Sequence, residues 1–184
     1  MTDRALDDDG TRTQSTMSRF AEALPAALLV VPGPGGTVTF IHQLKGPYAG
    51  SWLLPGGGIE RGEAAEAAAL REAREETGIA VESCSLFAVY EFTGKWEQGD
   101  YHLLMFACLA DRAYELPAGY EGHNVGEIRQ ARLGEIAMHS TDYQILTDAG
   151  VAAYDDETIA RGLAEDGITM RAHRVGSTKR FIAP

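Results

Sequence analysis

The chain has 184 residues, of which 45% are hydrophobic and 23% are charged, and its formal net charge is −11. These proportions are typical of a soluble globular protein, and the length suits one domain with a sizeable core. Binding to a nucleic-acid backbone depends on basic patches, so the acidic balance predicts that no nucleic-acid polymer is a partner.

No stretch is long and apolar enough for a transmembrane helix, and residues 1–20 lack the apolar core of a signal peptide, so we expect a cytoplasmic protein with no membrane partner. Residues 1–18 are polar and acidic, which predicts a disordered tail. Residues 19–184 are expected to form a single domain with a C-terminal helical extension. The sequence leaves open a homodimer joined through the tail.

Short apolar segments begin the domain. Residues 26–31 and 37–41 predict a pair of strands on either side of a turn rich in proline and glycine, and residues 51–54 predict another strand. The run Pro55-Gly56-Gly57-Gly58 is expected to be neither strand nor helix, because glycine has no Cβ and readily adopts positive φ. Such a run lets the backbone approach a ligand closely, although a plain turn explains the glycines equally well.

A helix is predicted from Glu63, and Gly78 occupies the position expected for its C-cap. Because an α-helix advances about 100° per residue, Glu72, Glu75 and Glu76 fall within an arc of roughly 100°. Like charges at this spacing destabilise an isolated helix, and carboxylate oxygens are ligands that Mg²⁺ and Mn²⁺ prefer. The segment therefore indicates a divalent-metal site, and a solvated acidic face is the alternative interpretation.

Further elements are predicted after the helix: strands over 80–89, 101–109 and 128–133, a loop over 93–100, and helices over 141–149 and 155–165. Their order is not a regular alternation of strands and helices, which argues against a doubly wound fold. Cys84 and Cys108 lie in apolar, strand-like segments and are interpreted as buried free thiols.

The predicted helix and the glycines before it resemble the Nudix box. The residues that match in register are Gly57, Glu63, Arg71, Glu72, Ala73, Glu75, Glu76, Gly78 and Ile79. Ala73 is the one soft position, since the family often carries a bulkier aliphatic residue there. The resemblance implies an α/β fold, namely the Nudix α/β/α sandwich around a mixed β-sheet, and the hydrolysis of a nucleoside diphosphate linked to another group.

The resemblance also implies roles for individual residues. Arg71, Glu72, Glu75 and Glu76 match the catalytic residues of the family, and the last three match ligands of Mg²⁺ or Mn²⁺. The carbonyl of Gly56 is expected to join the metal ligands, and Gly56 and Gly57 to bind substrate. Glu63 is expected either to bind metal through water or to hold the loop. Arg71 is expected to pair with Glu75, one helical turn away. The general base is either a box glutamate or a later residue, for which Glu121 and Glu127 are the candidates.

The substrate is less well defined by the sequence. The family's ADP-ribose hydrolases often place a proline about sixteen residues beyond the box, where this chain has Lys95, and motifs of the NADH- and coenzyme A-directed branches are absent. The resemblance therefore favours a small nucleotide, most of all a nucleoside triphosphate, as substrate. The alternatives are an ADP-ribose or nucleotide-sugar pyrophosphatase and a nucleotide-sensing domain without catalysis. Aromatic residues in or beside predicted loops are interpreted either as stacking groups for a base or as ordinary core: Tyr48, Phe92, Trp96 and Tyr101.

Overall fold

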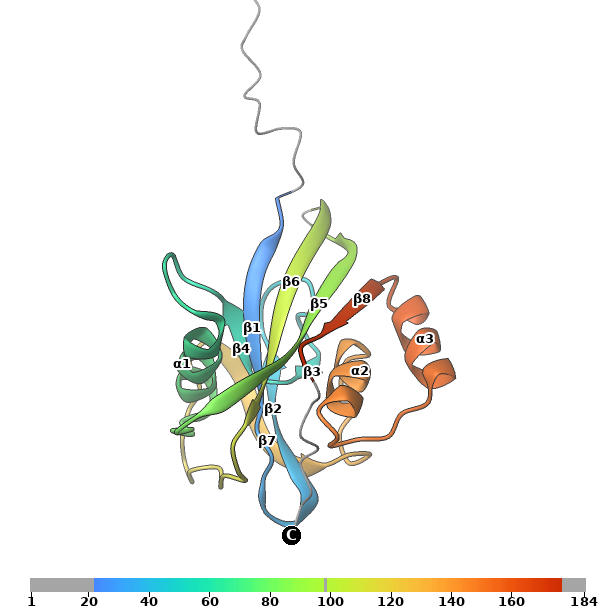
Figure 1. Ribbon diagram of the computed structural model, residues 1–184. Helices are drawn as coiled ribbons and strands as arrows, with labels where there is room; N and C mark the ends of the chain where they lie inside the picture. Colours follow the sequence, from blue (N-terminus) through green and yellow to red (C-terminus); the bar gives the residue numbers. More distant parts are fainter. Residues whose placement is uncertain (1–21, 98, 177–184) are drawn as a thin grey trace, which may run out of the picture.

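The computed structural model describes residues 22–97 and 99–176, and its strands form two sheets (Figure 1). The larger sheet has the strand order β4-β1-β6-β5-β8. Its strands are Leu24–Val30 (β1), Gly56–Gly58 (β4), Cys84–Trp96 (β5), Gly99–Ala110 (β6) and Thr169–Arg174 (β8). Because β1 pairs in parallel with β6 while the other neighbours are antiparallel, this sheet is mixed.

The smaller sheet has the strand order β3-β2-β7 and is antiparallel throughout. It contains Thr37–Gln43 (β2), Trp52–Leu53 (β3) and Val125–Arg132 (β7). A 3-10 turn, Pro34–Gly36 (η2), lies between β1 and β2.

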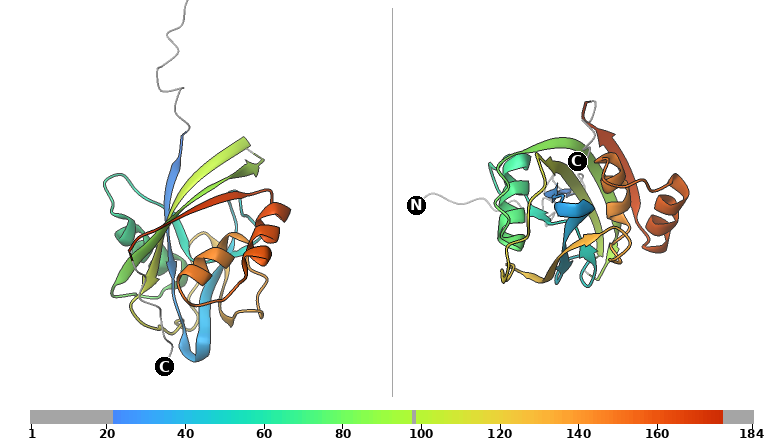
Figure 2. Two further views of the ribbon diagram at one scale, coloured as in Figure 1. Left: turned by 45° about the vertical axis from the view of Figure 1, so that its right-hand side comes forward. Right: turned by 90° about the horizontal axis from the view of Figure 1, so that it is seen from below.

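Three helices cover the sheets from opposite sides. Helix α1 (Ala65–Thr77) lies on one side, and α2 (Thr141–Asp148) and α3 (Asp156–Glu165) lie on the other, with the strands between them (Figures 1 and 2). This arrangement confirms the predicted α/β/α sandwich around a mixed sheet. Within the described residues, no helix has the length and apolarity needed to cross a membrane.

Alanine side chains determine how closely α1 approaches the larger sheet. Ala68, Ala69 and Ala73 are fully buried and pack in one cluster with Leu29 of β1 and Cys108 of β6. Since these side chains are small, the helix axis lies near the strands, and the carboxylates at neighbouring helix positions are brought close to β4. A second hydrophobic cluster fills the space between the sheets and α2 and α3.

The glycine run is a strand, and the prediction that it is neither strand nor helix was wrong. Gly56–Gly58 pairs antiparallel with β1, where Gly56 lies opposite Leu28, and none of the three glycines has a positive φ. A Cβ on Gly56 would lie 2.6 Å from the carbonyl oxygen of Ala27. Glycine is therefore needed here for close packing against a neighbouring strand, whereas the prediction considered its conformational freedom and close approach to a ligand.

The other differences concern strand ends and pairing. β5 begins at Cys84 rather than at residue 80, and the predicted loop over 93–100 is instead the end of a long hairpin, in which Lys95 pairs with Asp100. β7 begins at Val125, and β8 was not predicted. Both of these strands are stabilised by partners far away in the sequence, which a local pattern does not contain. Cys108 is a buried free thiol as predicted, Cys84 is a half-buried one, and the tail over 1–18 lies outside the described residues.

Candidate active site

Most residues that match the box lie on α1 or on the strand β4 that faces it, while Glu63 lies in the loop between them and Gly78 and Ile79 follow the helix. The helix ends at Gly78, whose φ of 73° is left-handed and whose N–H donates to the carbonyl of Arg74 at 2.9 Å. A left-handed residue after the last helical turn is the usual reason for glycine at this position. The predicted C-cap is thus confirmed.

Arg71 joins the helix to the loop before it. Its Nε and Nη2 each donate to one carboxylate oxygen of Glu63 at 2.9 Å, its Nη1 donates to Glu72 at 2.7 Å, and its Nη2 also donates to the carbonyl of Gly58 at 3.0 Å. The predicted contact with Glu75 is present but longer, at 3.5 Å. The planar guanidinium fits a carboxylate with two parallel hydrogen bonds, and for this reason Glu63 is its main partner.

The same arrangement explains the ionisation of Glu63. The guanidinium of Arg71 and the N–H of Glu60 hold the pKa of the Glu63 carboxyl at about 2, well below its ordinary value. Of the two roles expected for Glu63, holding the loop is the one for which the structure supplies contacts.

Glu76 is the most buried of the three helix carboxylates, with 7% of its surface exposed. Its Oε2 accepts the N–H of Gly56 at 2.9 Å, across the gap between α1 and β4. The pKa of Glu76 is raised to about 8, mainly by burial and also by the nearby charges of Glu72 and Glu75, while the Gly56 hydrogen bond opposes the shift. A positive charge beside this carboxylate would favour its ionised form.

The middle glycine of β4 lies directly against the carboxylate of Glu72. A Cβ on Gly57 would be 2.6 Å from Oε1 of Glu72, whereas a Cβ on Gly58 would meet nothing within 4 Å. Gly56 pairs with β1 at a position where the neighbouring carbonyl of Pro55 accepts from Leu29, so the N–H and C=O of Gly56 both point away from β1. The backbone of β4 at Gly56 and Gly57 therefore lies close to the carboxylates of Glu76 and Glu72.

These residues fit a divalent cation in their chemistry. Three carboxylates and an outward-pointing backbone carbonyl are hard oxygen donors of the kind that Mg²⁺ and Mn²⁺ prefer. The glutamates are not gathered at one point, because Glu72 turns toward Arg71 and Glu76 toward the N–H of Gly56. Consistent with this, no group of three or more His, Cys, Asp or Glu side chains within residues 22–97 and 99–176 has metal-site geometry.

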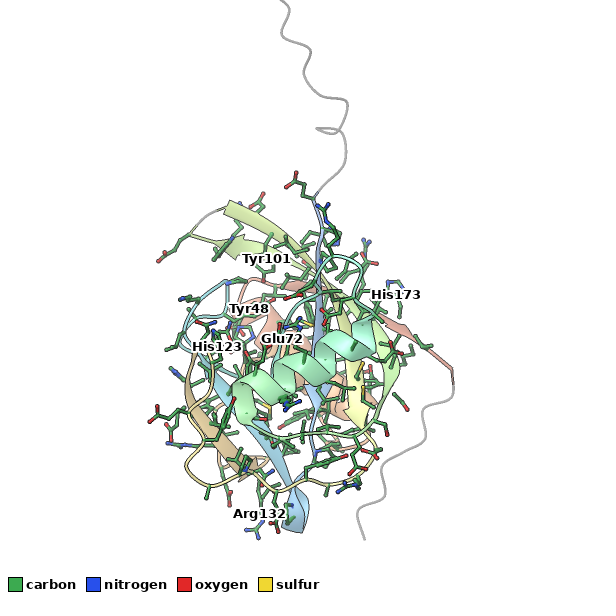
Figure 3. The ribbon with its side chains drawn as sticks, turned by 90° about the vertical axis from the view of Figure 1, so that its left-hand side faces the viewer. Tyr48, Glu72, Tyr101, His123, Arg132 and His173 are labelled. Carbon is green, nitrogen blue, oxygen red and sulfur yellow. The ribbon has the colours of Figure 1, made fainter. Side chains whose placement is uncertain are left out.

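The two later glutamates occupy different settings. The segment before β7 is fastened to the end of α1: Tyr120 donates its hydroxyl, and His123 its N–H, to the carbonyl of Glu75, both at 2.9 Å. Glu121 is an exposed residue of this segment. His123, which follows it by two positions, is labelled in Figure 3. Glu127 lies in β7 and pairs with Arg129 at 2.7 Å.

A cavity of about 460 Å³ adjoins β4 on the side of the smaller sheet and α2. The residues that line it include all three glycines of β4, and most of the others are apolar. Of the four aromatic residues considered as stacking groups, Tyr48 and Phe92 line the cavity. Tyr101 is instead buried with its hydroxyl 3.1 Å from that of Tyr48, and Trp96 packs against the edge of the core.

Asp142 is a functional candidate that the sequence analysis did not identify. It lies in the first turn of α2, lines the cavity and is only 2% exposed. The backbone N–H of Leu54 donates to its Oδ2 at 2.8 Å, and burial raises the pKa of Asp142 to about 7. An aspartate at a helix start is usually a cap, and only the hydrogen bond from the backbone N–H of Leu54, 88 positions earlier, reveals a different environment.

A family model described as the NUDIX domain matches residues 23–149 of this chain. The chain belongs to the Nudix family. The match includes the strand β4, the Nudix box helix and α2, so the cavity and the carboxylates lie within the matched region.

Similar curated Nudix proteins differ in the activity that their names state. The chain is 37% identical to an uncharacterized Nudix hydrolase, YvcI of Bacillus subtilis, over 49% of this chain and 53% of that protein. It is 41% identical to 8-oxo-dGTP diphosphatase of Escherichia coli over 38% of this chain and 50% of that protein. It is 58% identical to an RNA pyrophosphohydrolase of Dinoroseobacter shibae over 32% of this chain and 37% of that protein. The chain thus spans about half, or less, of the length of these relatives.

A solved structure confirms the fold. The Nudix domain of Shewanella oneidensis NrtR, in complex with ADP ribose, superposes with a TM-score of 0.58 and 18% sequence identity over 72% of this chain and 89% of that chain. At this identity the similarity concerns the architecture alone.

Proposed function

We propose that this chain is a divalent-metal-dependent pyrophosphohydrolase that cleaves the diphosphate linkage of a small nucleotide, with a nucleoside triphosphate as the preferred class of substrate. The observation that supports this most is the position of β4. One side of this strand faces Glu72 and Glu76, and the same three glycines line a cavity of about 460 Å³. Ligand cavities of this size are mostly apolar and hold the organic part of a ligand.

The residues proposed to hold Mg²⁺ or Mn²⁺ are Glu72, Glu75, Glu76 and the carbonyl of Gly56. When bound, the ion offsets the negative charge of the diphosphate and increases the acidity of a water molecule that attacks it. The protein around Glu76 disfavours ionisation of its buried carboxyl, so a cation bound at this carboxylate would relieve an unfavourable interaction. Because Gly57 has no side chain, the carboxylate of Glu72 can lie directly beside it.

Arg71 is proposed as a positioning residue. Both carboxylate oxygens of Glu63 and the carbonyl of Gly58 already accept its N–H groups, so the guanidinium fixes the loop, the end of β4 and Glu72 relative to one another. The carboxylate of Glu127 forms an ion pair with the guanidinium of Arg129. We therefore place the general base on a box glutamate, with the exposed Glu121 as the alternative.

The test is phosphate release from a panel of substrates with Mg²⁺ or Mn²⁺: nucleoside triphosphates, ADP-ribose, dinucleoside polyphosphates, nucleotide sugars and 5′-triphosphorylated RNA. We expect metal-dependent release from at least one nucleoside triphosphate and weaker activity on the others. Either metal should also raise the melting temperature, because a ligand that binds only the folded state stabilises it. Binding of nucleotides without any turnover would instead identify a sensing domain, and a melting curve unchanged by millimolar metal would count against the carboxylate site.

A further inference from the structure

The last turn of α1 leaves the backbone carbonyl of Glu75 without a donor from the helix itself. In a continuing helix, the N–H of Ile79 would donate to this carbonyl. It donates instead to the hydroxyl of Thr77 at 3.2 Å, because the chain turns into a left-handed conformation at Gly78. The turn that carries two of the proposed metal ligands, Glu75 and Glu76, is therefore completed by groups from outside the helix.

Two donors from the segment before β7 reach this turn. The hydroxyl of Tyr120 is shared between the carbonyls of Glu75, at 2.9 Å, and Arg74, at 3.2 Å, across 45 and 46 positions of the sequence. The N–H of His123 donates to the same carbonyl of Glu75 at 2.9 Å. The ring of Tyr120 lies over Gly78, where a Cβ would be 2.6 Å from the ring atom Cγ. The segment is thus fastened to the helix end by a side chain and by its own backbone.

Gly122 allows the segment to come this close. A Cβ on Gly122 would overlap the backbone carbonyl oxygen of Glu76, which belongs to the helix and cannot move aside. The φ of Gly122 is not positive, so the requirement is for space rather than for conformation. Asn124, two positions later, is the only non-glycine residue in the described part of the chain with a positive φ. Backbone in this uncommon region persists where surrounding contacts hold it, and the neighbouring N–H of His123 makes such a contact with α1.

The charges on this turn explain why it needs an anchor from outside. The C-terminal end of a helix carries partial negative charge, so the carboxylates of Glu75 and Glu76 are unfavourable there, and they also repel Glu72 and each other. A carbonyl without a partner in the same turn would add to this cost. Because the hydroxyl of Tyr120 and the N–H of His123 bind backbone oxygens, they stabilise the turn without occupying a carboxylate.

We infer that Tyr120 is a positioning residue for the metal site: through its hydroxyl it holds the last turn of α1 in the place where Glu75 and Glu76 bind a divalent cation. This inference rests on the metal site of the proposed function. Tyr120 acts through the backbone of the helix and touches neither the ion nor the substrate. Its loss therefore weakens metal binding first, and slows hydrolysis only because less of the enzyme carries metal.

Tyr120→Phe removes the hydroxyl and keeps the ring over Gly78. We expect the variant to bind Mn²⁺ about tenfold more weakly than the wild type, because residues that orient metal ligands typically contribute at this level. The electron paramagnetic resonance signal of free Mn²⁺ measures this without any turnover. In steady-state assays the Mg²⁺ concentration for half-maximal rate should rise by a similar factor, while KM for the nucleotide at saturating Mg²⁺ stays the same.

Tyr114→Phe is the matched control. The hydroxyl of Tyr114 also makes two hydrogen bonds, accepting the N–H of Glu82 at 2.9 Å and donating to Asp111 at 2.8 Å, and neither partner belongs to α1. We expect a similar fall in melting temperature in both variants but an unchanged Mn²⁺ affinity in Tyr114→Phe. A wild-type Mn²⁺ affinity in Tyr120→Phe, or equal weakening in both variants, would overturn the inference.

Gly122→Ala tests the same anchor without altering the tyrosine. The added methyl group pushes the segment away from the carbonyl of Glu76, so the hydroxyl of Tyr120 and the N–H of His123 are both displaced. We expect Mn²⁺ affinity to fall by at least as much as in Tyr120→Phe, in a protein that circular dichroism shows to be folded. Unchanged Mn²⁺ binding by the folded variant would contradict the anchor.

The binding measurement separates this inference from the proposed function. Weaker Mn²⁺ binding in Tyr120→Phe, together with no hydrolysis by the wild type, would support the inference and refute the proposed activity. Hydrolysis by the wild type, with the same Mn²⁺ affinity and Mg²⁺ dependence in Tyr120→Phe, would refute the inference alone. A wild-type protein that binds no Mn²⁺ would refute both.

Discussion

The two sides of β4 differ in how far apart their interacting residues lie in the sequence. On the α1 side, every hydrogen-bond partner of Arg71 lies within 13 positions of it. On the cavity side, Asp142 binds the backbone of Leu54 across 88 positions. The first side is rich in charge and resembles a family motif, whereas the second is apolar with one buried carboxyl. We expect the first to set the rate for all substrates and the second to set the choice among them.

The largest effect is expected at Glu76. Glu76→Gln keeps an oxygen that can accept the N–H of Gly56 but removes the charge, so kcat should fall by at least about 100-fold while the melting temperature does not drop. Glu66→Gln, on an exposed face of the same helix, should change kcat little. Steady-state kinetics at saturating Mg²⁺ measures both. Equal and small effects of the two substitutions would contradict the three-carboxylate interpretation.

The next effect compares two neighbouring glycines. Gly57→Ala places a Cβ 2.6 Å from the carboxylate of Glu72, which is the flexible end of a side chain and can move aside. We expect about a tenfold or greater loss of kcat with little change in melting temperature, since only the position of the carboxylate is disturbed. Gly58→Ala meets nothing within 4 Å and serves as the matched control. Loss of activity in both variants alike would mean that β4 itself, rather than Glu72, is sensitive.

A moderate effect is expected from Arg71→Lys. A lysine keeps the charge but not the two parallel hydrogen bonds to Glu63, so the loop and Glu72 are held less firmly. We expect about a tenfold lower kcat/KM and a higher Mg²⁺ concentration for half-maximal rate. If Arg71 contacted substrate instead, KM would rise and the Mg²⁺ dependence would not shift.

The smallest effect concerns stability on the cavity side. The pKa of Asp142 is about 7 in the folded protein, whereas the carboxyl of the unfolded chain titrates near 3.8. Between these two pH values the folded protein keeps a proton on Asp142 that the unfolded chain has released. The free energy of unfolding therefore falls as pH rises between these values and levels off above them.

Asp142→Asn should remove this dependence. At pH 8 we expect its free energy of unfolding to exceed that of the wild type by about 1 kcal/mol or more, and near pH 4 the difference should vanish. Urea titrations at the two pH values measure this. Asp148→Asn loses an ion pair with Arg174 and should not be more stable than the wild type at pH 8. A gain of equal size at both pH values would show that ionisation of Asp142 is not the cause.

The same contrast explains what the sequence predicted. The box helix, its glycine cap and the proximity of Glu72 and Glu76 depend on helical spacing, and the resemblance added the sandwich fold. The strand character of the glycines, the long β5–β6 hairpin and β8 depend on partners from other parts of the chain. Asp142 was missed for the same reason, because its sequence neighbourhood gives no sign that it faces a cavity beside β4.

The central claim is that the carboxylate helix and the cavity are two halves of one site joined by β4. A crystal structure with Mn²⁺ and a nonhydrolysable nucleoside triphosphate analogue tests it most directly, because anomalous scattering locates the metal independently of the ligand. We predict a manganese peak within about 2.5 Å of oxygens from Glu76 and at least one more of the proposed ligands, with the base of the nucleotide in the cavity. A metal peak away from α1, or a base bound outside the cavity, would contradict the account.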